Sequence, residues 1–297
     1  MFRGAFTALV TPFKNGQVDY SALEALIESQ ISRGIDGLVP CGTTGESPTL
    51  TEKEHDDVIA FTVKAVKKRV TVIAGTGSNS TDEAIRYTRH AKEVGADAAL
   101  LACPYYNKPS QRGLIAHYSA VAQAVPMPLV LYNVPGRTGV NLNAETVAEL
   151  SRNPHIVGVK EASGNLEQMI RIRALCDPDF ALISGDDTLT LPILSIGGTA
   201  VISVTSHLVP GETSRQVHSY LDGKTDESKE LFFKTYDLVK TVMGAEVNPV
   251  GIKTALALRG EIAEEYRLPL VAASAESKDA IRKALDKAGL LTPAGRR

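Results

Sequence analysis

The sequence predicts a (β/α)₈ barrel followed by a C-terminal helical extension. Eight short runs rich in Val, Ile and Ala alternate with longer segments of amphipathic spacing. The chain has 297 residues, whereas such a barrel needs about 250. An open doubly wound sheet would usually carry a Gly-rich turn after its first strand, but Thr11-Pro12-Phe13 stands there. Together these three observations favour the closed barrel.

The eight apolar runs are expected to form the barrel strands. Parallel strands lie between the barrel interior and the surrounding helices, so both of their faces are buried and they read as continuous apolar stretches. The runs span residues 5–10, 37–41, 70–75, 96–103, 128–134, 156–160, 180–185 and 199–204.

The segments between the runs carry the signals of helices. Leu23, Ile27 and Ile31 recur every four residues and predict one apolar stripe that packs on the barrel. The segments Thr51-Glu52-Lys53-Glu54 and Ser80-Thr81-Asp82-Glu83 both match the capping box, in which a hydroxyl and a carboxylate bind free backbone N–H groups. Each therefore predicts the start of a helix.

Beyond about residue 224 the strand pattern stops and helical spacing continues. One segment carries Leu231, Phe232, Tyr236, Val239 and Met243 at helical spacing, and a last one carries Ile281, Leu285 and Ala288. No Pro/Gly/Ser-rich linker separates these segments from the barrel. We expect a catalytic barrel of residues 1–224 and a helical region of residues 225–297 packed on it.

Composition limits the classes of partner. The formal net charge is -2 and the basic residues are dispersed, which argues against nucleic-acid binding and against a polybasic membrane anchor. No apolar stretch reaches about 18 residues, so no membrane span is expected. These features predict a cytoplasmic protein with small-molecule partners.

The cysteines and acidic residues give no metal signature. Cys41, Cys103 and Cys176 are odd in number and lack Cys-x-x-Cys spacing, so we expect reduced, mostly buried thiols. The histidines lack close metal-ligand pairing. Asp186 and Asp187 are adjacent, which is more typical of solvated or capping carboxylates than of ion ligands. No metal site is predicted.

Polar residues that directly follow the apolar runs are the candidates for an active site. In barrel enzymes the site lies at the carboxyl ends of the strands. The sequence places polar segments there after five runs, at residues 42–46, 104–107, 132–139, 160–164 and 184–187.

Lys160 is the most unusual of these residues because it ends the apolar run Ile156-Val157-Gly158-Val159. Burial disfavours the charged ammonium, and a neutral amine can attack a carbonyl carbon to form an imine. The alternative is a structural lysine that extends to the barrel rim or pairs with Glu161. The spacing alone leaves both open.

Four further residues suit proton transfer or carboxylate binding beside such a lysine. Tyr132 ends the neighbouring run, and a phenol can carry protons, although it could equally cap the barrel. Thr43 and Thr44 lie between two glycines, in a turn that either binds an anion or only connects strand to helix. Arg137 is either an ordinary loop charge or a bidentate carboxylate ligand.

Three motifs make the chain resemble the dihydrodipicolinate synthase and N-acetylneuraminate lyase family nearly end to end. They are Gly42-Thr43-Thr44-Gly45-Glu46, Tyr132-Asn133-Val134-Pro135-Gly136-Arg137-Thr138 and Gly158-Val159-Lys160-Glu161-Ala162-Ser163. The resemblance implies that Lys160 forms a Schiff base with pyruvate and that Tyr132 and Thr43 relay protons. It also implies that Tyr106 joins the relay from a neighbouring subunit and that Thr44 binds the pyruvate carboxylate.

Within the family, Arg137 matches the synthase pattern Tyr-Asn-x-Pro-x-Arg-Thr, and Pro104-Tyr105-Tyr106-Asn107-Lys108-Pro109 agrees with it. This implies a lyase of lysine (diaminopimelate) biosynthesis in which Arg137 holds the carboxylate of L-aspartate 4-semialdehyde. Gly185 and Ile202 match backbone positions near the substrate. Two alternatives stay open: a pyruvate-dependent aldolase or dehydratase acting on a sugar acid, and a carboxylate-binding sensor barrel without imine chemistry.

The resemblance also implies assembly and regulation. Family members are commonly homotetramers, and no cofactor is implied because the protonated imine is itself the electron sink. An L-lysine effector site is implied at Ser47, His55, Asn79, Glu83 and Tyr105. Pro48 and Glu52 depart from the small residue and histidine of many sensitive bacterial members, and Glu83 could serve only as a helix-capping carboxylate.

Overall fold

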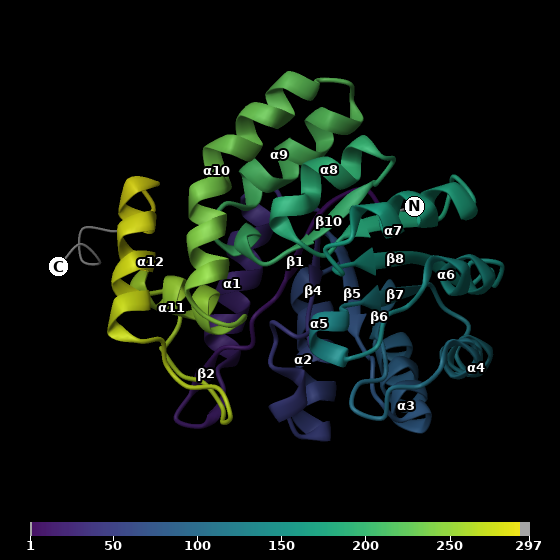
Figure 1. Ribbon diagram of the computed structural model, residues 1–297. Coiled ribbons are helices and arrows are strands. Elements are labelled where there is room, and N and C mark those ends of the chain that lie inside the picture. Colours follow the sequence, from purple (N-terminus) through teal and green to yellow (C-terminus); the bar gives the residue numbers. More distant parts are fainter. Residues whose placement is uncertain (1, 292–297) are drawn as a thin grey trace.

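The computed structural model describes residues 2–291 and contains a closed barrel of eight parallel strands (Figure 1). Around the barrel the order is β1-β10-β9-β8-β7-β6-β5-β4, with β4 paired to β1. Each predicted run coincides with one strand, so the predicted fold class is confirmed. The strands are β1 (Gly4–Ala8), β4 (Gly37–Val39), β5 (Thr71–Gly75), β6 (Ala98–Ala102), β7 (Leu129–Asn133), β8 (Ile156–Glu161), β9 (Ala181–Ser184) and β10 (Ala200–Ser203).

Helices follow the strands and cover the outside of the barrel. Leu131, Val159 and Leu182 point outward and pack against these helices, while Val130, Ile183 and Ile202 fill the interior cluster. The covering helices are α1 (Tyr20–Ser32), α2 (Glu52–Val66), α3 (Thr81–Glu93), α4 (Gln111–Ala124), α6 (Ala144–Leu150), α7 (Leu166–Leu175), α8 (Thr190–Ser195) and α9 (Pro210–Leu221).

Of the two predicted capping boxes, only the first is complete. At α2, the Thr51 hydroxyl accepts from the Glu54 N–H and the Glu54 carboxylate accepts from the Thr51 N–H. At α3, the Ser80 hydroxyl accepts from the Glu83 N–H, but the Glu83 carboxylate instead accepts from the Ser78 hydroxyl at 2.6 Å. The second capping box was therefore predicted wrongly in one of its two bonds. The Glu83 carboxylate binds the Ser78 hydroxyl in place of the Ser80 N–H.

The buried face of α1 differs from the predicted apolar stripe at its last position. Ile27 is fully buried, but Ile31 is only half-buried and Gln30 takes the buried position. The Thr7 hydroxyl donates to the Gln30 side chain at 2.7 Å, so a polar side chain fills a place that apolar spacing assigned to isoleucine.

A hairpin that the sequence reading did not predict follows β1. Strands β2 (Phe13–Lys14) and β3 (Gln17–Val18) pair antiparallel around Asn15 and Gly16, which have φ values of 55° and 78°. Positive φ at both central residues is what a two-residue hairpin turn requires, and Asn-Gly is its usual sequence.

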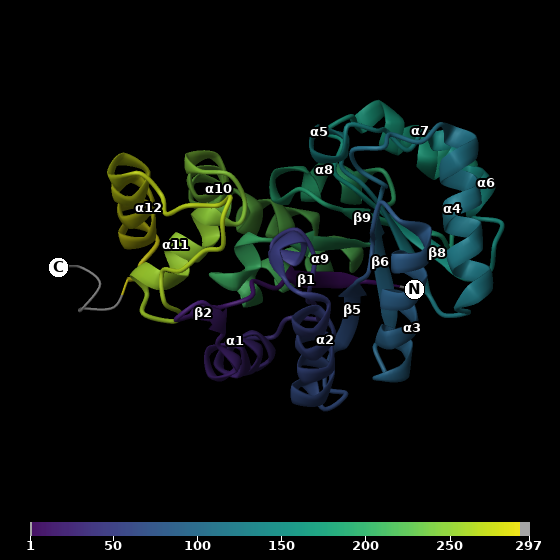
Figure 2. The same ribbon diagram turned by 90° about the horizontal axis from the view of Figure 1, so that it is seen from below.

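The C-terminal region forms three helices on one side of the barrel (Figures 1 and 2). They are α10 (Thr225–Ala245), α11 (Val250–Leu258) and α12 (Ala275–Lys287). Of these, α10 and α12 match the predicted segments, whereas α11 was not predicted. Leu238, Ile252 and Ile281 belong to the same apolar cluster as Ile202 of the barrel. The division at residue 224 stays a prediction, and residues 292–297 of the predicted helical region lie outside the described residues.

The three cysteines are free and buried, as predicted. Burial raises the pKa of the Cys103 thiol to about 11 and raises that of Cys41 further, so neither is an activated thiolate. Within residues 2–291, no helix is long and apolar enough to cross a membrane. The same residues contain no group of three or more His, Cys, Asp or Glu side chains placed to hold a metal ion.

His207 is a fully buried histidine in the short 3₁₀ helix Thr205–His207, which follows the carboxyl end of β10. Its Nε2 lies 3.1 Å from the Val10 N–H, which donates to it, and its Nδ1 lies 2.8 Å from the Val204 carbonyl. Because Nε2 accepts a hydrogen bond, the network assigns the neutral tautomer with the proton on Nδ1. Burial lowers the pKa of His207 to about 4.

We predict that acid destabilises the protein partly through this ring. Since the pKa of His207 falls from 6.5 when unfolded to about 4 when folded, its contribution is complete above pH 6.5 and is lost as pH falls toward 4. About 3 kcal/mol is at stake, at 1.36 kcal/mol per pKa unit. Urea unfolding of His207→Gln, whose amide oxygen can still accept from Val10, should show a shallower loss of stability across this range. An unchanged slope would contradict the assignment.

Candidate active site

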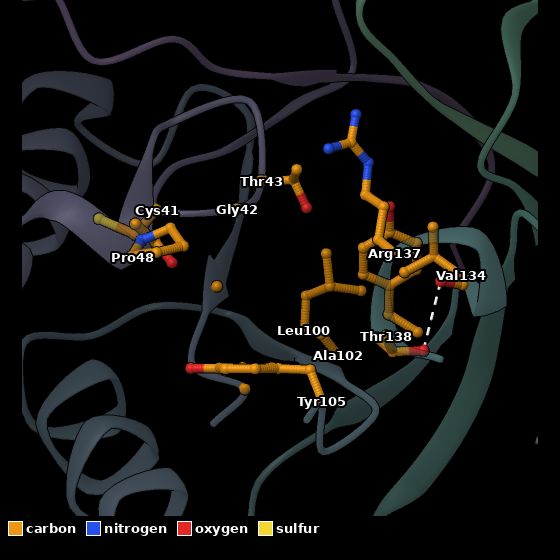
Figure 3. Close-up of a pocket in the computed structure, with 14 residues that line it drawn as sticks. Cys41, Gly42, Thr43, Pro48, Leu100, Ala102, Tyr105, Val134, Arg137 and Thr138 are labelled. Carbon is orange, nitrogen blue, oxygen red and sulfur yellow. Dashed lines mark hydrogen bonds between the residues drawn. The ribbon is translucent and has the colours of Figure 1, made fainter. Parts of the chain in front are cut away.

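Two adjoining cavities lie at the carboxyl ends of the barrel strands. The outer cavity has a volume of about 380 Å³ and the inner one of about 110 Å³. Thr43, Tyr132 and Arg137 line both, so the two form one continuous site. Figure 3 shows Thr43 and Arg137 on one side of the pocket, with the ring of Tyr105 across from them.

Lys160 enters the inner cavity from β8 and is 6% exposed. Its Nζ lies 4.2 Å from the centroid of the Tyr132 ring. Within residues 2–291 no carboxylate forms an ion pair with this amine, and no hydrogen bond to it is made. The alternative in which Lys160 pairs with its neighbour Glu161 is therefore wrong.

Glu161 points to the opposite side of β8, as strand alternation requires. Its carboxylate accepts from the Asn133 amide at 3.0 Å, from the Gln168 amide at 3.0 Å and from the Ser163 N–H at 2.7 Å. These bonds join β7, β8 and α7 outside the barrel and leave Lys160 facing inward.

Tyr132 and Gly185 flank the lysine on the neighbouring strands. Tyr132 pairs with Lys160 in the register of β7 and β8, and its hydroxyl makes no hydrogen bond to another of residues 2–291. Gly185 lines the inner cavity just beyond β9. A Cβ at this position would lie 3.1 Å from the Lys160 Cε and 2.7 Å from the Ala162 Cβ, so only glycine leaves room for the lysine side chain.

The loop after β4 brings Thr43 and Thr44 to the cavity. Neither backbone N–H donates to another residue in the described part of the chain, so both remain available to an anion. The Thr44 hydroxyl accepts from the Asn248 side-chain amide at 3.0 Å. This bond leaves the hydroxyl hydrogen of Thr44 free to donate to a ligand.

A fully buried ion pair fixes the far end of the same loop. Lys253 of α11 binds Glu46, and both side chains are completely inaccessible. Lys253 Nζ also lies 4.4 Å from the centroid of the Phe13 ring, and the Arg267 N–H donates to Glu46. Burial lowers the pKa of Lys253, while the charge of Glu46 opposes this shift. The C-terminal region thus fixes the loop that carries Thr43 and Thr44.

Arg137 is exposed at the mouth of the cavities, in the short helix α5 (Pro135–Thr138). It donates through Nη2 to the Asn248 carbonyl at 3.2 Å. The side chains that line the two cavities include two basic residues, Lys160 and Arg137, and no aspartate or glutamate. The site is therefore electrostatically suited to anionic ligands.

Two of the residues expected near the substrate lie outside these cavities. Ile202 lies in β10 with its side chain in the interior apolar cluster. Tyr106 is 89% exposed and has a φ of 71°, which a bulky residue rarely adopts. It does not line either cavity of this chain.

Of the residues expected at an effector site, Ser47 and Tyr105 line the outer cavity. Burial raises the pKa of Tyr105, and the nearby charge of Glu83 raises it further. The Asn79 carbonyl accepts from the Asn107 amide at 2.9 Å. His55 is buried beneath Cys41, its pKa is lowered by burial to about 4, and its ring packs on Tyr87.

Sequence reasoning missed Asn248 and Lys253, the residues that the extension contributes. Lys253 carries a readable signal, because it interrupts the apolar segment Val250–Leu258 just as Lys160 ends an apolar strand. Asn248 carries none, since an asparagine before a proline is ordinary in a loop.

Comparisons with known proteins agree on one family. The model of the dihydrodipicolinate synthetase family matches residues 1–288. The 4-hydroxy-tetrahydrodipicolinate synthase of Syntrophus aciditrophicus is 51% identical over 291 residues, covering 98% of this chain and 100% of the relative.

Two solved structures are also similar. The dihydrodipicolinate synthase of Acinetobacter baumannii complexed with pyruvate has a TM-score of 0.95 and 41% identity, over 98% of this chain and 100% of that one. The DHDPS of Cyanidioschyzon merolae with lysine bound has a TM-score of 0.94 and 45% identity, over 98% and 99% of the two chains.

We predict that Lys253→Met lowers the free energy of unfolding by about 3–5 kcal/mol, because it leaves the Glu46 carboxylate buried without the ammonium group that it binds. The double variant Glu46→Gln/Lys253→Met should lose less, since no buried charge remains. Urea denaturation measures both. The control is Lys287→Met, which removes an exposed pair with Asp237 and should leave the midpoint unchanged. Equal stability of Lys253→Met and this control would contradict the prediction.

Proposed function

Because the chain belongs to the dihydrodipicolinate synthetase family, we propose that it acts as a 4-hydroxy-tetrahydrodipicolinate synthase. In this reaction pyruvate condenses with L-aspartate 4-semialdehyde in lysine biosynthesis. The observation that carries the proposal is the buried amine of Lys160, which has no carboxylate partner in residues 2–291 and shares its cavity with Tyr132 and Arg137.

In this proposal Lys160 is the covalent nucleophile. Its Nζ attacks the ketone carbon of pyruvate, water leaves, and the protonated imine draws electrons from the adjacent methyl group. Loss of a methyl proton gives an enamine, whose carbon attacks the aldehyde. The carbonyl chemistry thus needs no cofactor, and the room beside Gly185 supports a covalently extended lysine at this position.

Tyr132, Thr43 and Tyr106 are assigned to proton transfer. The free hydroxyl of Tyr132 beside Lys160 supports its part, and Thr43 lines the same cavities. Tyr106 would enter the site of a neighbouring subunit. Its exposure of 89% and its positive φ support that role, because a protruding aromatic side chain in a strained conformation suits a contact between chains. We infer a homotetramer on this basis and from the family.

Two carboxylate sites complete the assignment. The free N–H groups and the hydroxyl of the Thr43–Thr44 turn suit the pyruvate carboxylate, and Arg137 at the cavity mouth suits the carboxylate of the aldehyde. Gly185 would border the bound substrate, and Ile202 would act only from the barrel interior. A cytoplasmic location is part of the proposal.

Two other functions compete with this one. A related aldolase or dehydratase acting on a sugar acid would share Lys160 and Tyr132, but the guanidinium of Arg137 in the cavity lining supports an aldehyde that carries a carboxylate. A sensor barrel would bind pyruvate without forming an imine. Steady-state assays with both kinds of aldehyde separate the first alternative, and chemical trapping separates the second.

We predict that borohydride reduction in the presence of pyruvate attaches the pyruvate carbon skeleton to Lys160, because only an imine is reduced to a stable amine. Peptide mass mapping should locate the adduct there and find none in Lys160→Ala. Lys108→Ala, which removes an exposed lysine of the loop after β6, is the matched control and should be labelled normally. Labelling at another lysine would reject the proposed nucleophile.

We also predict that Tyr132→Phe lowers kcat by roughly 10² to 10⁴-fold, the usual contribution of a positioned acid or base. The aromatic ring on which Lys160 packs is retained, so trapping of pyruvate by borohydride should persist. Wild-type turnover in this variant would remove Tyr132 from the proton relay.

An L-lysine effector site beside the outer cavity is a further part of the proposal. Glu83 can pair with the effector ammonium, and Tyr105 lies between it and the outer cavity. Ser47, His55 and Asn79 surround the same region. Tyr105 directly precedes Tyr106, so an effector that moves Tyr105 would also disturb the proposed relay.

We predict partial inhibition by millimolar L-lysine at fixed pyruvate, and its loss in Glu83→Gln. Glutamine can still accept from the Ser78 hydroxyl but no longer carries the charge that binds an ammonium group. Glu93→Gln, in the last turn of the same helix, should remain as sensitive as the wild type. Indifference of the wild-type enzyme to lysine would dismiss the site.

A further inference from the structure

Asn248 brings an unused hydrogen-bond acceptor to the active site. It lies in the connection between α10 and α11 and lines the inner cavity with Lys160. Its side-chain amide donates to Thr44, and its backbone carbonyl accepts from Arg137. Its Oδ1 is buried and has no hydrogen-bond partner among residues 2–291. A buried acceptor without a partner is costly unless a ligand supplies the donor.

The charge pattern of the site indicates what that donor would be. The lining side chains offer no carboxylate to an ammonium or amine group. The Thr44 oxygen already accepts from Asn248, and the Thr138 hydroxyl donates to the Val140 carbonyl at 2.9 Å. The amide oxygen of Asn248 is thus a neutral acceptor without a partner among residues 2–291, in a cavity that Lys160 and Arg137 also line.

The position of the Asn248 acceptor relative to Arg137 suits a ligand that carries an α-amino and an α-carboxylate group. The α-amino and α-carboxylate groups share one carbon atom, so a substrate whose carboxylate is held by Arg137 must present its amine nearby. Arg137 binds the backbone of Asn248 directly, at 3.2 Å. The acceptor thus lies on the residue that Arg137 already contacts.

We propose that Asn248 Oδ1 accepts a hydrogen bond from the α-amino nitrogen of the aldehyde substrate and thereby distinguishes an amino-acid aldehyde from an amine-free one. The inference rests on the proposed function. It makes Asn248 a specificity-determining residue supplied by the C-terminal extension rather than by the barrel.

A neutral acceptor also suits the ring-closing step. There the amine lone pair forms a bond to the imine carbon, the bond from that carbon to Lys160 Nζ breaks, and one proton passes from the incoming nitrogen to the departing Nζ. The incoming amine must be unprotonated to attack. An amide oxygen orients the N–H without stabilising the ammonium form, whereas a carboxylate at the same place would hold the proton.

The test compares Asn248→Ala with wild type on L-aspartate 4-semialdehyde and on succinate semialdehyde, in which hydrogen replaces the amine. The variant should lose roughly 10 to 100-fold in kcat/KM for the amino-acid aldehyde, as expected for one lost hydrogen bond. The inhibition constant of succinate semialdehyde against that substrate should change by less than about threefold. Equal losses for both aldehydes would overturn the inference, because Asn248 would then act only by placing Thr44 and Arg137.

Asn248→Asp keeps the shape of the side chain and provides a second measurement. Its kcat should fall and its pH profile should move to higher pH, because the carboxylate favours the protonated amine. An unmoved pH profile contradicts the inference.

Asn153→Ala is the control and should match wild type, because Asn153 precedes the amino end of β8 whereas the site lies at the carboxyl ends of the strands. Borohydride trapping of pyruvate should persist in every variant, and loss of condensation in the wild type would instead reject the proposed function.

Discussion

The hydrogen bonds of Glu161 determine which side of β8 faces the barrel interior, and the position of Lys160 depends on them. A one-residue slip of this strand would place the carboxylate inside the barrel and the amine under α7. The partners of Glu161 come from β7 and α7 as well as from the loop after β8. Because several elements satisfy one buried carboxylate, a change of register would break all of these bonds together.

The site also depends on residues more than 200 positions away from the loop of Thr43 and Thr44, to which we assign anion binding. The barrel alone presents Thr43 and Thr44 on a turn, and such turns are mobile unless their ends are held. Here Asn248 holds Thr44 and Lys253 holds Glu46. The extension therefore contributes to the chemistry directly, and its apolar packing against the barrel interior keeps these two polar contacts in place.

The sequence predicted the strands and the polar residues that follow them, since both are local consequences of burial in a parallel barrel. It did not predict contacts that connect distant segments. Gln30 of α1 replaced Ile31 as a buried residue because it accepts a hydrogen bond from Thr7 of β1. A local competition was missed as well, because Glu83 bonded Ser78 rather than completing its capping box. The Asn15-Gly16 turn did carry a local signal, and its hairpin could have been read directly.

The site is basic although the chain as a whole is slightly acidic. The formal net charge is -2, yet the cavity linings contain two basic side chains and no carboxylate. A site with low-dielectric walls and one sign of charge raises the local concentration of oppositely charged ligands. Lys160 is the deeper of the two basic residues and becomes covalently modified in the proposed reaction, while Arg137 remains at the mouth. In that reaction the keto acid must reach Lys160 before the second anion binds at Arg137, because the site of Arg137 lies on the way to the buried amine.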